Sequence, residues 1–190
     1  MINIGVLASY NASGFLALQE AINKGLLQAK IKILISNNHN AKALENAKNQ
    51  DLKALVINHK KYPNENIDNL IKEEFKKEGC EYILLSGYMK KLGSELTKNF
   101  KIINSHPALL PKFGGKGMYG TFVHKAVIEA KEKVSGCTIH YVNEEYDKGE
   151  IILQKSFYLK EDESYESLEE KVKDLEKKAL LEVFIKLCNI

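Results

Sequence analysis

An amide and an imidazole stand two residues apart where an apolar run of the sequence ends. Asn104 and His106 follow Ile102 and Ile103, and Pro107 comes directly after the histidine. Residues two apart on a strand share a face, so both side chains are expected to point the same way. Proline also keeps the residue before it extended. A hydrogen-bond donor beside a proton-transfer group suits chemistry at one reacting atom, although a structural histidine is the alternative.

The elements that must position this pair alternate between two periodicities. Short apolar runs predict strands, and the amphipathic segments between them predict helices, which is typical of βαβ units around a parallel sheet. The expected strands cover residues 2–8, 31–36, 54–58, 82–87 and 101–105. The expected helices cover residues 13–27, 41–50, 66–77 and 94–99.

The last third of the chain departs from this alternation. Residues 137–142 and 150–157 are two strand patterns joined by a short loop, which predicts a hairpin-like addition to the sheet. Residues 164–187 predict a long helix, because apolar side chains recur at spacings of three and four. We therefore expect a single α/β domain over residues 1–190, with a doubly wound, Rossmann-like, mostly parallel sheet, helices on both faces and a late antiparallel strand addition.

Composition limits the classes of function. The formal net charge of the 190-residue chain is only +3, which argues against a dedicated nucleic-acid binder. No stretch reaches membrane-spanning length and no signal-peptide pattern opens the chain, so we expect no membrane partner. The three cysteines are far apart and odd in number. They argue against a disulfide framework and a zinc site, and for a reducing cytoplasm.

Two further loops are expected beyond the carboxyl ends of strands, where doubly wound sheets bind ligands. Residues 8–15 lead into a helix near Ser13 and Gly14, whose free N–H groups suit a phosphate. A capped helix without a ligand is the alternative, and no dinucleotide or triphosphate motif is present. Residues 84–96 place Met89 and Leu92 where a crevice is expected, although plain helix packing explains them too.

Several segments together resemble one family. "NSHPALLPKFGG", residues 104–115, resembles the N-x-H-P-[SA]-L-L-P signature of the folate-dependent formyltransferases. "GCTIHYVNEEYDKGEIILQ", residues 136–154, and "LSGYMKKL", residues 85–92, resemble further family segments. "SYNASGFLAL", residues 9–18, resembles the amino-terminal loop of the branch that acts on glycinamide ribonucleotide. The resemblance implies transfer of the formyl group of 10-formyltetrahydrofolate to that ribonucleotide's amine in de novo purine synthesis.

The resemblance adds Asp147 as a third catalytic partner of Asn104 and His106. The amine attacks the formyl carbon, an oxyanion forms, and the folate nitrogen must be protonated to leave. Asn104 and a charged His106 would donate hydrogen bonds to the oxyanion. Asp147 would favour that charge and accept or relay the amine's proton. A simple turn residue in "YDKG" is the alternative for Asp147.

The other site residues are also carried over from the resemblance. The sequence differs from the family pattern at two of these positions. Gly14 lacks a side-chain amide that is frequent in the family, and a lysine replaces a frequent arginine at position 90. An arginine usual near residues 58–70 is missing as well. The implied ribonucleotide contacts are Ala12, Ser13, Gly14 and Glu176, and the implied folate contacts are Met89, Lys90, Leu92, Asn104 and His140.

The resemblance also implies how the chain is organised. Residues 1–100 would form the mononucleotide-binding half, and residues 101–190 the folate and catalytic half. Residues 112–124 would form a mobile lid, with His124 as its anchor or as a plain helix residue. We expect a cytoplasmic monomer or homodimer that needs no metal and takes small-molecule substrates rather than nucleic acid. A formyltetrahydrofolate hydrolase, another formyltransferase, or a non-catalytic nucleotide- or folate-binding module are the alternatives.

Overall fold

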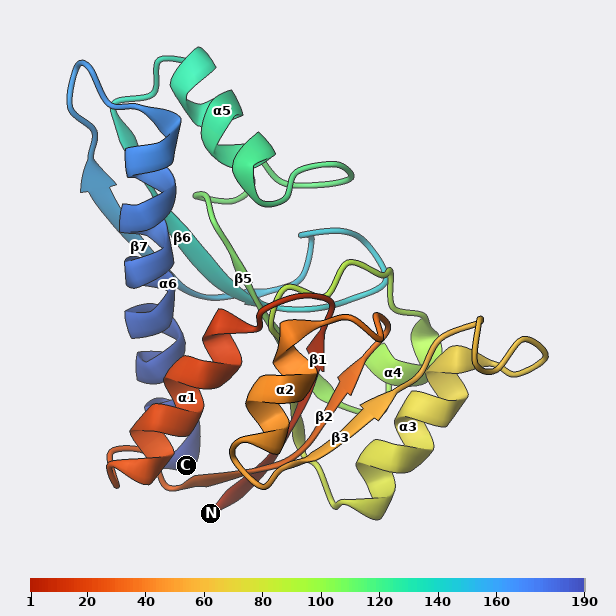
Figure 1. The fold of residues 1–190 in the computed structure, drawn as a ribbon. Coiled ribbons are helices and arrows are strands. Elements are labelled where there is room, and N and C mark those ends of the chain that lie inside the picture. Colours follow the sequence, from red (N-terminus) through yellow and green to blue (C-terminus); the bar gives the residue numbers. More distant parts are fainter. Residues whose placement is uncertain (190) are drawn as a thin grey trace.

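The computed structural model describes residues 1–189 and is built on one seven-stranded sheet in the order β3-β2-β1-β4-β5-β6-β7 (Figure 1). β1 to β5 run parallel, and β6 runs antiparallel to both β5 and β7. The strands are β1 (Ile2–Ala8), β2 (Ala29–Ser36), β3 (Lys53–Val56), β4 (Tyr82–Leu85), β5 (Lys101–His106), β6 (Val134–Tyr141) and β7 (Ile151–Tyr158). The predicted doubly wound sheet with a late antiparallel addition is confirmed.

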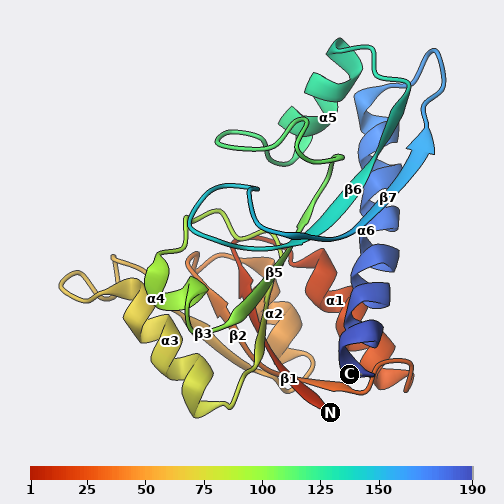
Figure 2. The ribbon, with the colours of Figure 1, turned by 180° about the vertical axis from the view of Figure 1, so that it is seen from behind.

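Helices cover both faces of the sheet, as the two opposite views show (Figures 1 and 2). The helices are α1 (Ser13–Asn23), α2 (Lys42–Lys48), α3 (Ile67–Lys77), α4 (Ser94–Thr97), α5 (Thr121–Glu129) and α6 (Tyr165–Cys188). One apolar core lies between the sheet and α1, α2 and α6. A second core lies on the other face under α3 and α4. None of the helices within residues 1–189 combines the length and apolarity needed to cross a membrane.

A bulge in β2 divides its apolar side chains between the two cores. Ile4 pairs with Ile31, whereas the next residue of β1 pairs with Ile33, so Lys32 is an additional residue on β2. Ile31 therefore faces the α1–α6 core, whereas Ile33 faces the α3–α4 core. Such an insertion reverses the facing of every later side chain. Both faces of the parallel strands are buried, which explains their continuous apolar runs.

The first helix ends earlier than the sequence predicted. The expected helix ran to residue 27, but α1 ends at Asn23. Gly25 adopts φ +70 and donates its N–H to Ile22, while Leu26 donates to Ala21. These two hydrogen bonds form a Schellman motif, which terminates the helix at a glycine. The apolar residues after Gly25 continue the helical spacing, so the sequence pattern alone does not show where the helix ends.

The stretch predicted as a lid over residues 112–124 is only partly a loop. Irregular backbone ends at Gly120, and α5 follows from Thr121 to Glu129. His124 is therefore a helix residue, and its side chain is buried. The glycines before α5 obscured its start in the sequence. Packing against α6 stabilises α5, because it buries one face of this short helix.

The close packing of β1 on α3 yields a test of the fold. A Cβ at Gly5 would lie 2.5 Å from the Phe75 ring. We expect Gly5→Ala to lower the free energy of unfolding by about 1–3 kcal/mol, because the core has no room for the methyl group. In a Phe75→Leu background the same change should cost less. Urea unfolding of the four variants measures this coupling, and an equal cost in both backgrounds would contradict the packing argument.

Candidate active site

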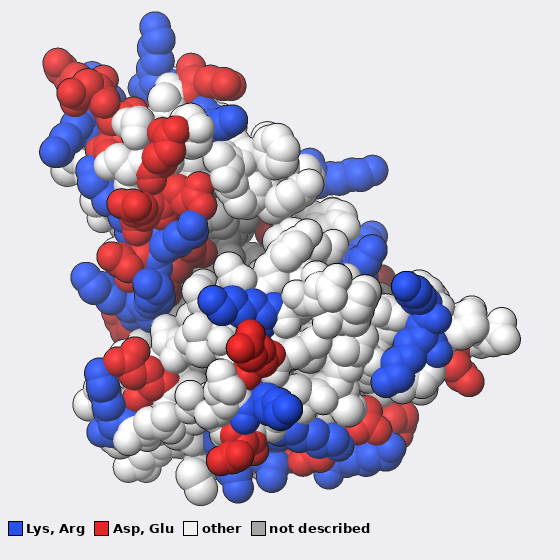
Figure 3. Space-filling model, viewed as in Figure 1, with Lys and Arg blue, Asp and Glu red and all other residues white. Residues whose placement is uncertain are grey.

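A cavity of about 660 Å³ opens beyond the carboxyl ends of β1, β4 and β5. The strand order changes direction between β1 and β4, which is where doubly wound sheets bind ligands. The walls come from α6 and from the loops that follow β1, β4, β5 and β6. In Figure 3 the surface is hollowed between the α5–α6 side and the part built on β1 to β4, and uncharged side chains border much of that hollow.

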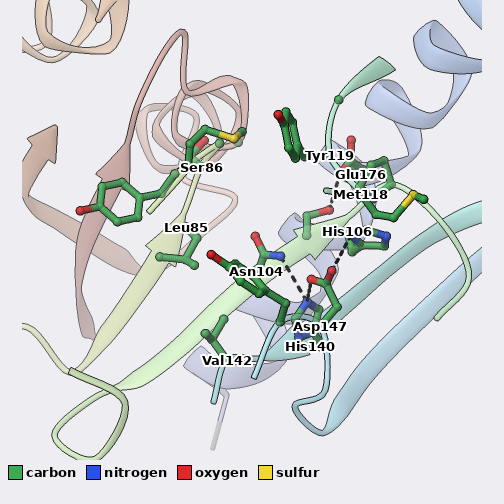
Figure 4. A pocket seen from close by; sticks show the side chains of 18 of the residues that line it. Leu85, Ser86, Asn104, His106, Met118, Tyr119, His140, Val142, Asp147 and Glu176 are labelled. Carbon is green, nitrogen blue, oxygen red and sulfur yellow. Dashed lines mark hydrogen bonds and ion pairs between the residues drawn. The ribbon is translucent and has the colours of Figure 1, made fainter. Parts of the chain in front are cut away.

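Four polar side chains meet at one end of this cavity (Figure 4). Asn104 and His106 project from the end of β5, and His140 comes from the adjacent β6. The two oxygens of Asp147 lie 3.6 Å from His106 Nδ1 and 3.7 Å from His140 Nε2. Asn104 Nδ2 lies 3.2 Å from His140 Nε2. The convergence of residues 104, 106 and 147 expected from the sequence is present, and His140 joins it.

Backbone carbonyls fix which ring nitrogens carry protons. His106 Nε2 lies 2.8 Å from the carbonyl oxygen of Phe113, so Nε2 must be the donor. His140 Nδ1 likewise donates to the carbonyl of Tyr141 at 2.8 Å. In the neutral rings, His106 Nδ1 and His140 Nε2 therefore have no proton, and both face Asp147. The geometry leaves room for one additional proton between the carboxylate and the rings.

Burial keeps both histidines uncharged at neutral pH. Loss of solvent lowers the pKa of His106, and this outweighs the opposing pull of the Asp147 carboxylate and the Phe113 carbonyl. Burial also lowers the pKa of His140. In the free protein the pKa of His106 thus lies below its ordinary value, although the Asp147 carboxylate favours the charged ring as expected. The carboxylate lies 3.6 Å away, beyond a direct hydrogen bond, while the imidazole is almost fully buried.

The glycine-rich loop before α5 holds Asp147 in place. The residue has a left-handed backbone, with φ +55, which aspartate tolerates better than most residues. The N–H of Gly115 donates to Asp147 Oδ2 at 2.8 Å. A Cβ at Gly114 would lie 3.3 Å from that of Asp147 and 2.5 Å from Leu110. The loop thus packs directly against Asp147, and a side chain at position 114 would crowd both Asp147 and Leu110.

The start of α1 forms a second polar corner of the cavity. Ala12 caps the helix with a left-handed backbone, φ 56, and provides no side-chain cap. Among residues 1–189, the N–H groups of Ser13 and Gly14 have no acceptor, whereas that of Phe15 donates to Ser86 Oγ at 3.1 Å. Free N–H groups and the positive helix end favour an anion here. Ser13 and Gly14 line the cavity, but Ala12 is buried and does not.

Glu176 lies between these two polar regions, on α6. Its Oε1 accepts a hydrogen bond of 2.7 Å from Ser105 Oγ. Burial raises the pKa of Glu176 to about 7. Lys173 and Lys177, on the same helix, also line the cavity. A carboxylate beside two cations suits recognition of vicinal hydroxyl groups next to an anionic ligand.

The remaining wall is mainly apolar and follows β4. Met89, Lys90 and Leu92 all line the cavity, as do Leu85 and Val142. Leu92 belongs to the α3–α4 core, whereas the side chain of Met89 is 41% exposed. Such a wall suits the flat, largely apolar ring system of a ligand.

The family comparison bears on this site directly. Residues 2–184 match the model of a family described as formyl transferase. The chain belongs to this formyl transferase family. Because the match runs from β1 to α6, it covers every element that contributes to the cavity.

Individual relatives agree on one branch of the formyl transferases. The chain is 35% identical over 190 residues to a chloroplastic phosphoribosylglycinamide formyltransferase of Arabidopsis thaliana, covering 98% of this chain and 65% of that protein. It is 34% identical over 179 residues to the phosphoribosylglycinamide formyltransferase of Haemophilus influenzae, covering 93% of this chain and 82% of the relative. The chain thus spans just under two thirds of the Arabidopsis protein.

Solved structures give the same likeness. Glycinamide ribonucleotide transformylase 1 from Symbiobacterium toebii superposes with a TM-score of 0.91 at 29% identity, covering 100% of this chain and 88% of that one. Phosphoribosylglycinamide formyltransferase from Campylobacter jejuni superposes with a TM-score of 0.86 at 33% identity, covering 98% and 97%. The fold of this formyl transferase chain is therefore shared over its whole length.

Sequence reasoning missed several groups that this formyl transferase site uses. The carbonyl of Phe113 and the N–H of Gly115 are backbone groups, and a pattern of residue types cannot predict which backbone groups take part in a site. Ser86 is a polar residue directly after β4 and is visible in the sequence, but its partner is the backbone N–H of Phe15. Ser105 lies inside the quoted motif, but its side chain points away from Asn104 and His106, so the motif alone does not place it in the site.

The charge balance at Asp147 can be tested without substrate. We expect Asp147→Asn to lower the pKa of the His106 imidazole further, because the carboxylate is the strongest of the groups that favour the charged ring. Titration of the ring proton signals by NMR measures the shift, with exposed Asp162→Asn as the control. An unchanged or raised His106 pKa in the Asp147 variant would contradict the arrangement.

Proposed function

We propose that this protein transfers the formyl group of 10-formyltetrahydrofolate to the amine of N1-(5-phospho-β-D-ribosyl)glycinamide, a step of de novo IMP synthesis. The observation that carries the proposal is the meeting of Asn104, His106 and Asp147 at the end of a cavity whose other corner is the free N-terminus of α1. Relatives named for this reaction support it.

Asn104 stabilises the charge that develops on the formyl oxygen. One of its two amide hydrogens is donated to His140 Nε2, and the second remains available to the substrate. The neutral His140 ring thereby sets the amide orientation, because only its unprotonated Nε2 accepts this bond. A fixed donor aimed at developing negative charge is typically the largest single contribution to such catalysis.

His106 and Asp147 accept the proton that the attacking amine loses. The neutral ring has an unprotonated Nδ1 opposite the carboxylate, so the proton has a prepared position. Once it arrives, the carboxylate offsets the charge of the imidazolium, which can then donate to the reacting group. The low pKa of His106 favours release of that proton to the leaving nitrogen.

The two substrates occupy opposite parts of the cavity. The ribonucleotide phosphate lies at the N–H groups of Ser13 and Gly14, and its ribose hydroxyls lie at Glu176. The folate ring system lies along Met89, Lys90 and Leu92, within reach of His140. This arrangement assigns the phosphate site to residues 1–100 and the reacting groups to residues 101–190, with Glu176 crossing that division. Cys80, Cys137 and Cys188 are free thiols, in keeping with a reducing, cytoplasmic setting.

An absorbance assay separates this function from its alternatives. The purified protein is mixed with 10-formyl-5,8-dideazafolate and the ribonucleotide, and the deformylated folate is followed. Product only when both substrates are present supports the transferase. Product without the ribonucleotide identifies a hydrolase, and no product in either case identifies a non-catalytic binding module.

Removal of the amide donor tests the role of Asn104. We expect Asn104→Ala to reduce kcat roughly 100-fold, about 3 kcal/mol of barrier, because one oxyanion donor is lost. The KM values of both substrates should change little. Steady-state kinetics beside Asn99→Ala, an exposed asparagine outside the cavity, provide the comparison. A kcat within threefold of the unmodified protein would rule out the assigned role.

A negative charge at the start of α1 tests the phosphate position. Ser13→Asp should raise the KM of the ribonucleotide at least tenfold, because a carboxylate there repels the phosphate, while the KM of the folate stays near its original value. Ser167→Asp, which adds the same charge to the first turn of α6 outside the cavity, is the control. Equal increases in both KM values would place the phosphate elsewhere.

A further inference from the structure

The side chain of Ser105 lies between the two reacting residues in the sequence but points to the other face of β5. Asn104 and His106 turn toward Asp147 and His140, and the alternation of a strand sends Ser105 toward α6. There its hydroxyl donates to Glu176 Oε1 at 2.7 Å. One strand therefore holds the reacting groups on one face and contacts an acidic cavity residue on the other.

Ser105 is the side chain that holds Glu176 by a hydrogen bond. The neighbouring cations on α6 are engaged elsewhere, since Lys173 pairs with Glu169 and Lys177 lies 3.0 Å from Asp174. Within residues 1–189, Ser105 is the only hydrogen-bond partner of the Glu176 carboxylate. The second oxygen of that carboxylate, Oε2, remains for a ligand in the cavity that Glu176 lines.

We propose that Ser105 is a positioning residue for the ribonucleotide: it fixes Glu176 so that the free carboxylate oxygen receives the ribose hydroxyls at a set distance from Asn104 and His106. This inference rests on the proposed function and deepens it. A hydrogen bond across the β5–α6 contact then sets where the amine end of the ribonucleotide arrives, because the ribose is tied to the same strand as the reacting groups.

The hydroxyl also stabilises the ionised form of Glu176. Burial raises the pKa of this carboxyl to about 7, while the Ser105 bond and the charges of Lys173 and Lys177 act in the opposite direction. Loss of the bond therefore raises the pKa further, and more of the carboxyl is protonated at neutral pH. A protonated Glu176 accepts hydrogen bonds from ribose hydroxyls less strongly, so binding weakens as the pH falls.

The other titratable groups around Glu176 are not expected to change charge in the pH range of the measurement. On β6, burial raises the pKa of Cys137 to about 12. On α5, burial lowers the pKa of His124, and the same holds for His106 and His140 across the sheet. Between pH 7 and 9 the thiol and the three rings thus stay uncharged, and a change in ribonucleotide binding that depends on Ser105 reports Glu176.

The experiment compares Ser105→Ala with Ser105→Thr, which keeps a hydroxyl, and with Ser135→Ala. Ser135 is buried on β6, and its hydroxyl has no partner within residues 1–189, so it is a matched control. At pH 7, Ser105→Ala should raise the KM of the ribonucleotide roughly tenfold, in keeping with loss of a hydrogen bond to a charged group. The KM of the folate should stay within twofold.

Raising the pH should narrow the difference in ribonucleotide KM between Ser105→Ala and the unmodified protein. At pH 9 the KM of Ser105→Ala should move toward that of the unmodified protein, because Glu176 is ionised in both, and the difference that remains reports the lost position of the carboxylate. Titration calorimetry of the ribonucleotide against the folate-free proteins should give the same order of affinities, and Ser105→Thr should restore most of the loss. Ser135→Ala should match the unmodified protein throughout.

Several results would overturn this role for Ser105. They are an unchanged ribonucleotide affinity in Ser105→Ala at pH 7, equal increases in both KM values, a difference in ribonucleotide KM that widens at pH 9, or no recovery in Ser105→Thr. In each of these cases an unmodified protein that still formylates the ribonucleotide leaves the proposed function standing. If the unmodified protein neither binds nor formylates it, the proposed function fails, and the role of Ser105 fails with it.

Discussion

The contact of the Asp147 carboxylate with two unprotonated ring nitrogens is the constraint on which the rest of the site depends. His106 comes from β5, His140 from β6, and Asp147 from the loop that follows β6. Two backbone carbonyls and the Gly115 N–H fix the orientation of all three side chains. A half-buried carboxylate facing lone pairs is unfavourable unless a proton can enter, so this arrangement is prepared to receive one.

The antiparallel addition to the sheet makes this contact geometrically possible. Asn104 on β5 is paired directly with His140 on β6, so the amide and the imidazole lie side by side across the strands. β6 ends at Tyr141 beside Ile103, so the loop that follows must turn back to bring Asp147 to the two histidines.

Close packing explains one departure from the usual family sequence. A Cβ at Gly14 would lie 3.0 Å from Leu180 Cδ1 and 3.1 Å from Ser86 Oγ. A side-chain amide at position 14 would thus require the Leu180 and Ser86 side chains to give way. At this corner the anion site consists of backbone N–H groups and the helix dipole, which need no side chain from residue 14. The glycine lets α1 and α6 approach each other directly beside the cavity.

The sequence by itself determined the doubly wound sheet, the antiparallel addition and the residues that meet in the cavity, because apolar periodicity and short motifs are local properties of the chain. Tertiary structure alone decided the direction in which the pKa of His106 shifts, since burial among distant segments outweighs the effect of the Asp147 carboxylate. It also decided the helical state of residues 121–129, and it joined Ser105 to Glu176. These outcomes depend on solvent exclusion and on contacts between residues far apart in the chain, which no local pattern records.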